Sequence, residues 1–257
     1  MFMKILAIGD FHGKLPKKLP KKDIDLILLV GDLGNADLGR KQSFKKIENP
    51  DYKPTPKQIK KAYLQSYIST IKILKKLNKI SKTFLVYGNV ESTDKETKEL
   101  SKKIKLKLPL LGKEIKKLKN IYNISKKTKK LKGISIAGYP YFVDKGWAKR
   151  FRNKKYLNKH KGEDKDARDF FKILKKVDIL LIHQPPYKIL DKVNSKYAPK
   201  DWQGKHAGSK IILNYIKKYS PNYAICGHIH EAKGEKKIGK TKVLNLGMRG
   251  YKVIEIK

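Results

Sequence analysis

The sequence has almost no cysteine and no long apolar run. Cys226 is the only cysteine in 257 residues, so no internal disulfide can form, which is typical of proteins that stay inside the cell. The N-terminal stretch MFMKILAIGD is short and ends in an acid, which fits a first strand rather than a signal peptide. No stretch is apolar over the roughly 18 residues that a membrane span needs. We therefore expect a cytoplasmic protein with no membrane partner.

Arginine is also scarce, although the chain is strongly basic. Basic residues outnumber acidic ones 63 to 23, a formal net charge of +40, and this field attracts polyanions without choosing among them. Bidentate reading of phosphates or bases favours arginine, whereas nearly all the basic residues here are lysine. The lysine excess fits an amino-acid composition shared by the whole proteome, as in a thermophile, better than it fits a dedicated nucleic-acid surface. Non-specific nucleic-acid binding stays open, and nothing indicates an oligomeric state.

Hydrophobic periodicity predicts alternating strands and helices, because continuous apolar runs favour buried strands and steps of three and four favour helices. The expected strands are residues 3–8, 24–30, 83–87, 133–137, 178–182 and 223–226. The expected helices are residues 56–80, a helix capped by Ser92 or Thr93, residues 163–176, and residues 209–219 capped by Ser209. No repeat or linker is visible, so we predict a single domain over residues 1–257.

Three segments carry other patterns. Residues 93–132 are dense in lysine yet keep apolar positions, which indicates an ordered, solvated face. Residues 185–208 hold three prolines and three aromatics without a period, which predicts a long functional loop. The C-terminal segments TKVLNLG and YKVIEIK alternate, which predicts an antiparallel pair.

Polar side chains follow five of the predicted strands at the point where each strand ends. In open α/β sheets, ligands bind beyond the carboxyl ends of the strands, so these side chains should meet. A single Gly-Asp or strand-end histidine is usually a turn or a satisfied polar group, but all five endings together predict a metal site. The seven candidates are Asp10 and His12 in GDFH, Asp32 in GD, Asn89 in GN, His183 in IHQPP, and His228 and His230 in GHIH.

The residue types indicate which metal. Carboxylate, neutral imidazole and amide oxygen suit divalent ions such as Mn, Fe, Zn or Ni. Alternation in Asp-Phe-His and His-Ile-His predicts that both polar side chains of each triplet lie on one side of an extended chain. Cys226 lies inside a predicted strand and is expected to point into the core.

The ordered set Asp-x-His, Gly-Asp, Gly-Asn, His and Gly-His-x-His resembles the calcineurin-like metallophosphoesterase superfamily, from Asp10 to Gly247. The segments GKHAGSK and YSPNYAICGHIHEAKGEKKIGKTKVLNLG are similar to its Icc-like predicted phosphoesterases, an archaeal-type branch. That branch usually has Asn-Pro-Gly where this chain has Asn245, Leu246 and Gly247. The resemblance implies a four-layer α/β/β/α sandwich with two mixed β-sheets and helices outside.

The resemblance also implies a function and a role for each ligand. The protein would hydrolyse a phosphate ester of a small molecule or nucleotide, with a phosphodiester favoured over a monoester. Two divalent metal ions, with manganese expected first, would share a bridging hydroxide. Asp10, His12 and His230 would hold one ion, Asn89, His183 and His228 would hold the other, and Asp32 would bridge both.

One position departs from the family pattern. Many members have a histidine after Gly-Asn, near the leaving group, but here Val90 can neither donate nor accept a proton. Losing an acid typically costs about 10²–10⁴ in rate. Either the substrate has a good leaving group or another residue supplies the proton. His206 is the candidate acid or substrate contact, with an exposed loop histidine as the alternative; His160 is expected to be such a loop residue.

Several side chains have two interpretations. Arg249 could contact a phosphate or support a turn. Tyr139, Tyr141, Trp147 and Trp202 could stack on a base, although aromatics more often pack.

Two further functions are alternatives to a phosphoesterase: a non-catalytic binding scaffold of the same fold, and a nuclease that uses the lysine-rich surface. The intact ligand set counts against the scaffold, and the valine after Gly-Asn counts against the nuclease.

Overall fold

Strands and helices alternate along much of the chain in the computed structural model, which describes residues 2–49, 51–152 and 154–257. The strands are β1 (Met3–Ile8), β2 (Leu26–Leu29), β3 (Thr83–Leu85), β4 (Ile121–Asn123), β5 (Lys127–Leu131), β6 (Ile134–Tyr139), β7 (Ile179–Ile182), β8 (Tyr223–Cys226), β9 (Gly234–Ile238), β10 (Thr241–Asn245) and β11 (Tyr251–Ile256). The α-helices are α1 (Asp37–Glu48), α2 (Pro56–Leu77), α3 (Asp94–Ile104), α4 (Leu111–Ile115), α5 (Lys145–Phe151), α6 (Lys154–Lys159), α7 (Lys161–Ile173) and α8 (Lys210–Tyr219). Short 3-10 helices cover Lys200–Trp202 and His230–Ala232.

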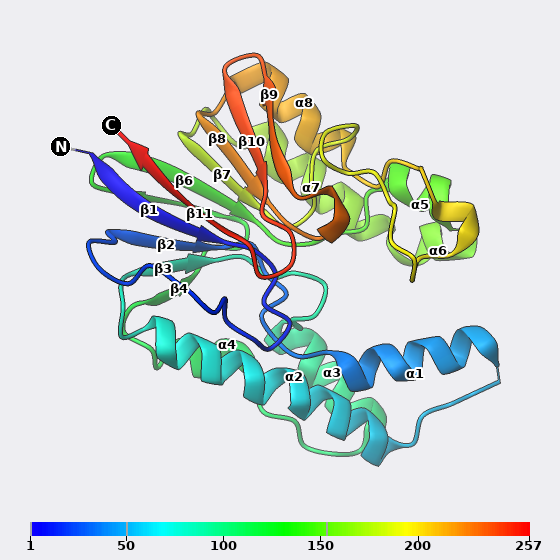
Figure 1. The fold of residues 1–257 in the computed structure, drawn as a ribbon. Helices are drawn as coiled ribbons and strands as arrows, with labels where there is room; N and C mark the ends of the chain where they lie inside the picture. Colours follow the sequence, from blue (N-terminus) through cyan, green and yellow to red (C-terminus); the bar gives the residue numbers. More distant parts are fainter. Residues whose placement is uncertain (1, 50, 153) are drawn as a thin grey trace.

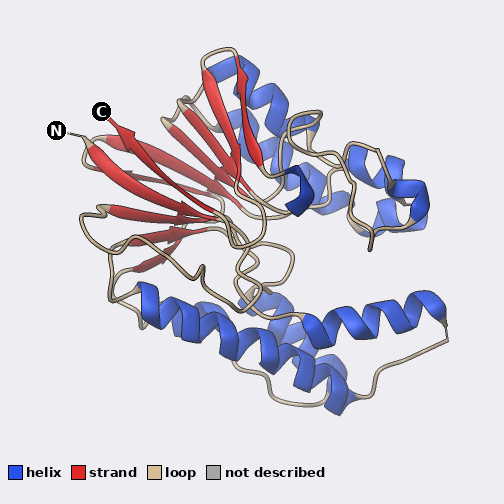
Figure 2. Cartoon of the chain, in the orientation of Figure 1, coloured by secondary structure: helices blue, strands red, loops and turns tan. Residues whose placement is uncertain are grey.

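The strands form two mixed sheets (Figures 1 and 2). The first has the order β11-β1-β2-β3-β4, with parallel pairs from β1 to β4 and the antiparallel strand β11 at its edge. The second has the order β5-β6-β7-β8-β10-β9, in which β5 and β9 are the antiparallel edges. Parallel neighbours place the carboxyl ends of the central strands of each sheet at one edge.

The two sheets pack face to face, and helices cover both outer faces. Ile5 and Leu28 of the first sheet share a buried cluster with Leu181 of the second. The other face of the first sheet packs against α2 through residues such as Leu74, and the other face of the second packs against α8 through residues such as Tyr215. The architecture is therefore the four-layer α/β/β/α sandwich expected from the sequence.

Two predicted helix caps are confirmed. Thr93, rather than Ser92, caps α3: its hydroxyl accepts the N–H of Glu96, while the Glu96 carboxylate accepts the N–H of Thr93, a reciprocal capping box. Ser209 caps α8 by accepting backbone N–H groups of the first turn.

The predicted C-terminal antiparallel pair is wrong. β10 pairs with β8 and β9 in the second sheet, whereas β11 crosses over and pairs with β1 in the first. The crossing is held by Asp10, whose N–H donates to Gly247 O at 3.1 Å and whose carbonyl accepts the Arg249 N–H at 2.8 Å. Alternation showed that each segment is a strand, but it carries no information on which strand pairs with which.

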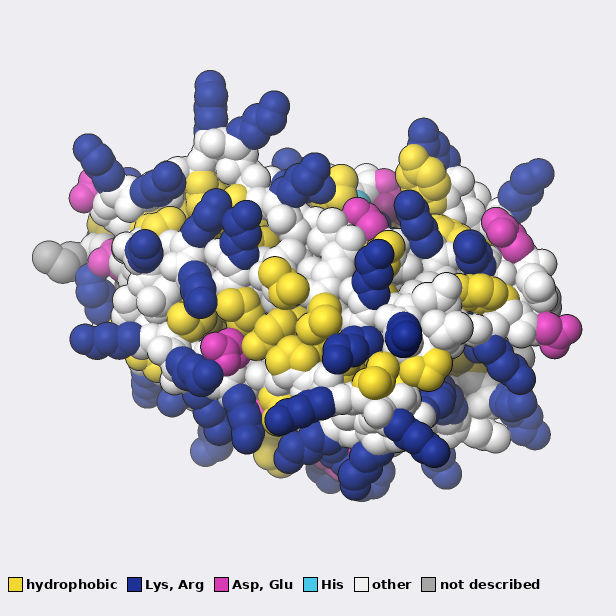
Figure 3. Space-filling view, turned by 90° about the horizontal axis from the view of Figure 1, so that it is seen from below, with side chains coloured by type: hydrophobic (Ala, Val, Ile, Leu, Met, Phe, Trp, Pro, Cys, Tyr) yellow, Lys and Arg dark blue, Asp and Glu magenta, His cyan; other side chains and the backbone are white. Residues whose placement is uncertain are grey.

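The lysine-dense regions hold strands and helices that periodicity did not predict. β5 and β9 are edge strands with almost all positions exposed, so neither shows an apolar alternation. β4, α1, α5 and α6 were likewise not expected. Figure 3 shows Lys and Arg side chains spread over the face of α1 to α4, with hydrophobic side chains between them. In the described part of the chain, no helix is long and apolar enough to cross a membrane.

Candidate metal centre

The seven predicted ligands meet beyond the carboxyl ends of the strands. Asp10 lies just after β1, Asp32 after β2, Asn89 after β3, His183 directly after β7 and His228 after β8. The two sheets face each other, so ends that are far apart in sequence converge at one place.

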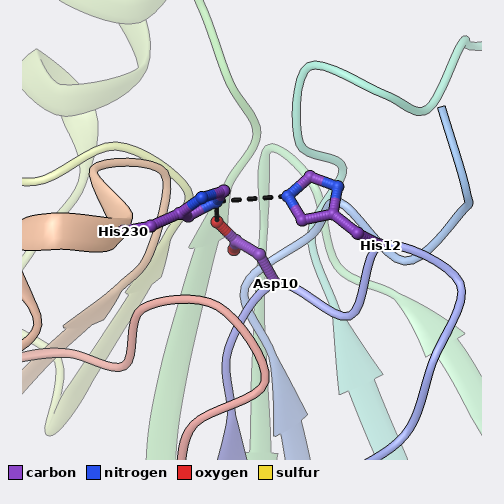
Figure 4. Close-up of side chains that lie close together, drawn as sticks. All are labelled: Asp10, His12 and His230. Atoms are coloured by element: carbon purple, nitrogen blue, oxygen red, sulfur yellow. Dashed lines mark hydrogen bonds and ion pairs between the residues drawn. The ribbon is translucent and has the colours of Figure 1, made fainter. Parts of the chain in front are cut away.

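Asp10, His12 and His230 form one group (Figure 4). His230 Nε2 lies 2.9 Å from Asp10 Oδ2 and 3.1 Å from His12 Nε2. His12 and Asp10 are buried, at 7% and 0% exposed, whereas His230 is half-buried. The group thus presents one carboxylate and two imidazole nitrogens to a common point that opens to solvent on the His230 side.

Asn89, His183 and His228 form the neighbouring group. Asn89 Oδ1 lies 3.1 Å from His183 Nε2 and 3.0 Å from His228 Nδ1. Asp32 lies between the groups: its Oδ1 is 3.7 Å from His183 Nε2 and its Oδ2 is 3.9 Å from His12 Nε2. One carboxylate therefore faces both sets of nitrogens.

His183 is held in a single tautomer. Its Nδ1 lies 2.7 Å from the carbonyl oxygen of Val30, which can only accept, so Nδ1 carries the proton. Burial lowers the pKa of His183 to about 3, so the ring is neutral and Nε2 presents a lone pair. That lone pair faces the Asn89 carbonyl oxygen, which is also an acceptor, so a cation held by these two residues would make the contact favourable.

The other charges also favour a cation. Burial lowers the pKa of His12 to about 4 and that of His228 to about 3, so both rings are neutral. Burial, then the charges of Asp10 and Glu91, raise the pKa of Asp32. A group of buried carboxylates with neutral histidines is costly without a positive ion among them.

Unpartnered polar atoms support the same conclusion. Asp10 Oδ1 and His12 Nδ1 are buried and have no hydrogen-bond partner in the described part of the chain. The ligand atoms of Asp10, Asp32 and His183 also lie within 4.8 Å of one another. Carboxylate, imidazole and amide donors at this spacing fit divalent metal ions.

The glycines in the Gly-Asn and Gly-His motifs leave room for the ligands. A Cβ atom on Gly88 would lie 2.2 Å from Asp32 Oδ1, and one on Gly227 would lie 2.3 Å from Asp10 Oδ1. No side chain fits at either position without moving a carboxylate. These two glycines are therefore part of the site, although they offer no ligand atom.

Glu91 is a site residue that the sequence analysis missed. Its buried carboxylate accepts the backbone N–H groups of Asp32 and Gly88, both at 2.9 Å, and of Leu33 at 2.7 Å and Gly34 at 3.4 Å. Burial raises its pKa, while these four donors favour its charged form. The available signal was an acid two residues after the Gly-Asn motif, at the end of a buried strand.

The prediction of extended triplets at the ligands is wrong. His12 and His228 have φ values of 44° and 68°, in the left-handed region, and so has Asp32 at 50°. The polar side chains of each triplet converge because the chain turns, not because it alternates. Phe11 and Ile229, the central residues, are nevertheless buried as expected, at 0% and 7% exposed.

Val90 and His206 lie in different surroundings. The Val90 N–H donates to Asp32 Oδ1 at 2.9 Å, so residue 90 supports the site through its backbone. His206 Nδ1 lies 2.6 Å from the buried carboxylate of Asp191. No described hydrogen bond joins His206 to the seven candidates, although its neighbour Ala207 shares an apolar cluster with Ile229.

Of the aromatic candidates, Tyr141 lies at the site. Its ring centroid is 5.2 Å from that of His228 and 5.9 Å from that of His183. Tyr139 is buried in the outer core of the second sheet. Trp147 and Trp202 contact each other, with ring centroids 6.0 Å apart.

Other predicted positions have local partners. The Arg249 Nε–H donates to the Phe11 carbonyl at 3.3 Å, so Arg249 braces the turn after β1. His160 Nδ1 lies 2.6 Å from Glu163 Oε1. Cys226 is buried in the core, as expected, and its thiol donates to the Leu244 carbonyl at 3.4 Å.

Asn245, where the chain reads Asn-Leu-Gly, braces the His228–His230 turn. Its Nδ2 donates to the carbonyls of Leu190 and Ile229, both at 2.9 Å, and its Oδ1 accepts the Gly247 N–H at 3.0 Å. The asparagine thus joins three loops beside the candidate ligands.

Comparison with known proteins identifies related chains. Residues 3–232 match the family model for calcineurin-like phosphoesterases. The uncharacterised protein MJ1162 of Methanocaldococcus jannaschii is 26% identical over 266 residues, covering 100% of this chain and 93% of that relative, which agrees with the archaeal-type branch. One crystal structure aligns with a TM-score of 0.63 at 20% identity, covering 99% of this chain and 95% of its own. Phosphopantetheinyl hydrolase from Mycobacterium tuberculosis aligns with a TM-score of 0.56 at 11% identity, covering 96% and 90%. At these identities, both structures show the fold.

Proposed function

The chain belongs to the calcineurin-like phosphoesterase family and is a metal-dependent phosphoesterase, and from that premise we propose that it hydrolyses a phosphodiester at two divalent metal ions. The observation that carries the proposal is the position of Asp32, whose two carboxylate oxygens face the two separate groups of nitrogen ligands. A single-ion site would not need a carboxylate between two ligand sets.

The proposed ligand roles follow the two groups. Asp10, His12 and His230 would hold one ion, Asn89, His183 and His228 would hold the other, and Asp32 would be shared by both. Bound divalent ions supply a nucleophile by lowering the pKa of a water and withdraw charge from the phosphate. The chain itself orients the ligands: Val30 fixes the His183 ring, and Glu91 holds the turn that carries Asp32. Manganese is the ion we propose, with iron, zinc and nickel as the alternatives for the test.

Two cavities support a diester rather than a monoester. One of about 400 Å³ and one of about 540 Å³ adjoin the site, and both are lined by Asn89, Glu91 and Ser92. A phosphodiester carries two organic groups on its phosphorus, whereas a monoester carries one. A phosphate at the metal centre can therefore place one group in each cavity.

The proton for the leaving group is proposed to come from His206. Asp191 is 1% exposed, and its carboxylate contacts His206 Nδ1. A carboxylate in this position orients the imidazole ring, so that the other ring nitrogen can transfer a proton. The Lys188 and Gly208 N–H groups donate to Asp191, so the carboxylate itself is fixed. The proposed substrate is a phosphorylated small molecule or nucleotide.

The test starts from protein stripped of metal by a chelator. We expect turnover of bis(p-nitrophenyl) phosphate to return with Mn²⁺ and to exceed that of p-nitrophenyl phosphate, with Fe²⁺, Zn²⁺ and Ni²⁺ assayed in parallel. Asp32→Ala and His228→Ala variants should lose turnover. Turnover that persists in either variant contradicts the two-ion site. Silence toward both esters with every metal points instead to a binding scaffold of the same fold.

A further inference from the structure

A cavity of about 400 Å³ lies beside the candidate metal centre, among α1, α2 and the segment after β3. Its lining includes two candidate ligands, His12 and Asn89. The apolar side chains of Val90, Ile59 and Leu100 also line it. Because the cavity and the metal centre share residues, a group attached to a phosphate at the centre can enter the cavity.

The cavity offers no uncompensated charge to a ligand. The chain carries 63 lysines and arginines, yet none of the described residues that line this cavity is a lysine. Arg40 is the cation in the lining, and its Nη2 already donates to Asp37 Oδ1 at 2.6 Å. The Glu91 carboxylate is occupied by backbone N–H groups. In a protein of this net charge, such a cavity favours an uncharged group over an anionic one.

The walls are preformed. The Tyr63 hydroxyl donates to the Pro109 carbonyl at 2.6 Å, and its ring stacks on that of Tyr67 with centroids 6.2 Å apart and planes at 19°. Fixed rings give an apolar wall that needs little ordering when a ligand binds.

The hydroxyl of Thr70, in the cavity lining, has no hydrogen-bond partner among the described residues. Thr70 is 1% exposed, and its Oγ1 makes no hydrogen bond in the described part of the chain. A buried hydroxyl without a partner carries a cost that a ligand atom can remove. The apolar side chains of the lining thus lie beside one buried hydroxyl that has no partner.

We propose that this cavity binds the uncharged, mainly apolar organic group of the substrate, so that the enzyme selects phosphodiesters with an aliphatic or aromatic substituent. The inference rests on the proposed function, because it places the phosphate of that substrate at the metal centre. Val90 acts here as part of the apolar wall, next to the ligand Asn89.

Alkyl p-nitrophenyl phosphates from methyl to hexyl test this selection, because the chromophore stays constant while the chain grows. With Mn²⁺ bound, we expect KM to fall by about threefold to fourfold per methylene until the cavity is full. An Ile59→Trp variant fills the cavity from α2, so it should remove the dependence of KM on chain length. The milder Ala62→Leu variant should shorten the chain at which KM stops falling.

Ile68→Trp is the matched control, because Ile68 lies on the same helix, is 60% exposed and does not line the cavity. In this control variant, KM should fall with alkyl chain length as it does in the wild type. A second measurement needs no activity: the uncharged fluorophore N-phenyl-1-naphthylamine, added to metal-free protein, should brighten with wild type and Ile68→Trp but not with Ile59→Trp. Circular dichroism verifies that each variant is folded.

The outcomes separate the two proposals. If the methyl ester is turned over but KM is the same for all chain lengths, the cavity inference is wrong and the phosphodiesterase stands. If no ester is turned over with any metal, the proposed function fails. If Ile59→Trp and Ile68→Trp bind the fluorophore equally well, the apolar site is elsewhere and the inference is overturned.

Discussion

The carboxylate of Glu91 accepts the backbone N–H of Asp32 at 2.9 Å, although 58 residues lie between them in the chain. The same oxygen accepts the Gly88 N–H, so one side chain ties the turn after β2 to the turn after β3. The first turn carries the proposed bridging ligand and the second carries Asn89. Glu91 is thus a positioning residue for ligands of both groups.

A Glu91→Gln variant keeps the size of the side chain but replaces one acceptor oxygen by an NH₂ group that faces backbone donors. We expect the free energy of unfolding to fall by about 2–3 kcal/mol, because the lost bonds are buried and charge-assisted. Urea unfolding of the metal-free protein measures the change. Glu235→Gln, at an exposed 3.6 Å pair with Lys252, is the control and should change stability by less than about 0.5 kcal/mol. Equal effects of both variants would contradict the positioning role.

A Gly227→Ala variant tests the space beside Asp10. The new Cβ atom would lie 2.3 Å from Asp10 Oδ1, so the carboxylate must move away from the other ligands. We expect the rise in Tm that Mn²⁺ produces in the wild type to be largely lost, since the stabilisation by a ligand grows with the logarithm of its concentration divided by Kd and vanishes when binding is weak. Gly162→Ala is the matched control, because a Cβ atom there meets nothing within 4 Å. An unchanged Mn²⁺ shift in Gly227→Ala would show that Asp10 is not a ligand.

The metal-free protein should lose stability as the pH falls from about 6.5 towards 4. The pKa of His12 is about 4 and that of His183 about 3 in the folded protein, because burial disfavours the charged rings. The unfolded chain takes up these protons below its ordinary pKa near 6.5, whereas the folded protein does not. His12, His183 and His228, whose pKa is also about 3, should together lower the free energy of unfolding by about 4–6 kcal/mol between pH 7 and pH 5.

Denaturant unfolding at several pH values, for wild type and a His183→Asn variant, measures this slope. The variant should lose about a third of the histidine contribution, because His12 and His228 keep theirs. The comparison isolates the histidine, because Asp32, whose pKa is raised by burial, contributes a slope of opposite sign in both proteins. If the free energy of unfolding changes with pH in the variant as it does in the wild type, His183 is not buried as a neutral ring.

A His206→Ala variant tests the proposed acid. An alkyl leaving group needs a proton more than a p-nitrophenyl group does, so the rate on the alkyl ester should fall by about 10²–10⁴ and the rate on the aryl ester by much less. Equal losses of rate on both esters would show that His206 is not the acid. If Asp191 orients His206 as proposed, Asp191→Asn should also lose more rate on the alkyl ester than on the aryl ester.

The lysine-rich surface should bind nucleic acid without sequence preference. Single- and double-stranded oligonucleotides are expected to bind at low salt and to dissociate near physiological salt. The reason is that lysines bind phosphates by displacing counter-ions, and added salt reverses this displacement. Fluorescence anisotropy over a salt series measures this. Tight binding that survives physiological salt would favour the nuclease alternative.

Much of the fold could be predicted from local patterns. The buried strands β2, β7 and β8 were visible as continuous apolar runs, since a strand covered on both faces needs apolar residues at every position. The caps Thr93 and Ser209 were readable because a cap acts on its own helix within three residues.

The composition of the candidate site was also readable from the sequence, because each ligand follows a strand directly and parallel strands end at one edge. Its geometry was not. The left-handed backbone at His12 and His228, the tautomer of His183 and the four bonds to Glu91 all depend on groups from other strands. The sequence motifs alone do not indicate those contacts.

The sequence by itself determined the strands, the helix caps and the set of side chains at the strand ends, since these depend on hydrophobic period and on neighbours a few residues away. Only the tertiary structure decided that β10 and β11 belong to different sheets, that Glu91 holds Asp32, and that an apolar cavity lies beside Val90. Strand partners, buried hydrogen bonds and cavities are properties of segments distant in sequence, and they exist only once the two sheets have packed together.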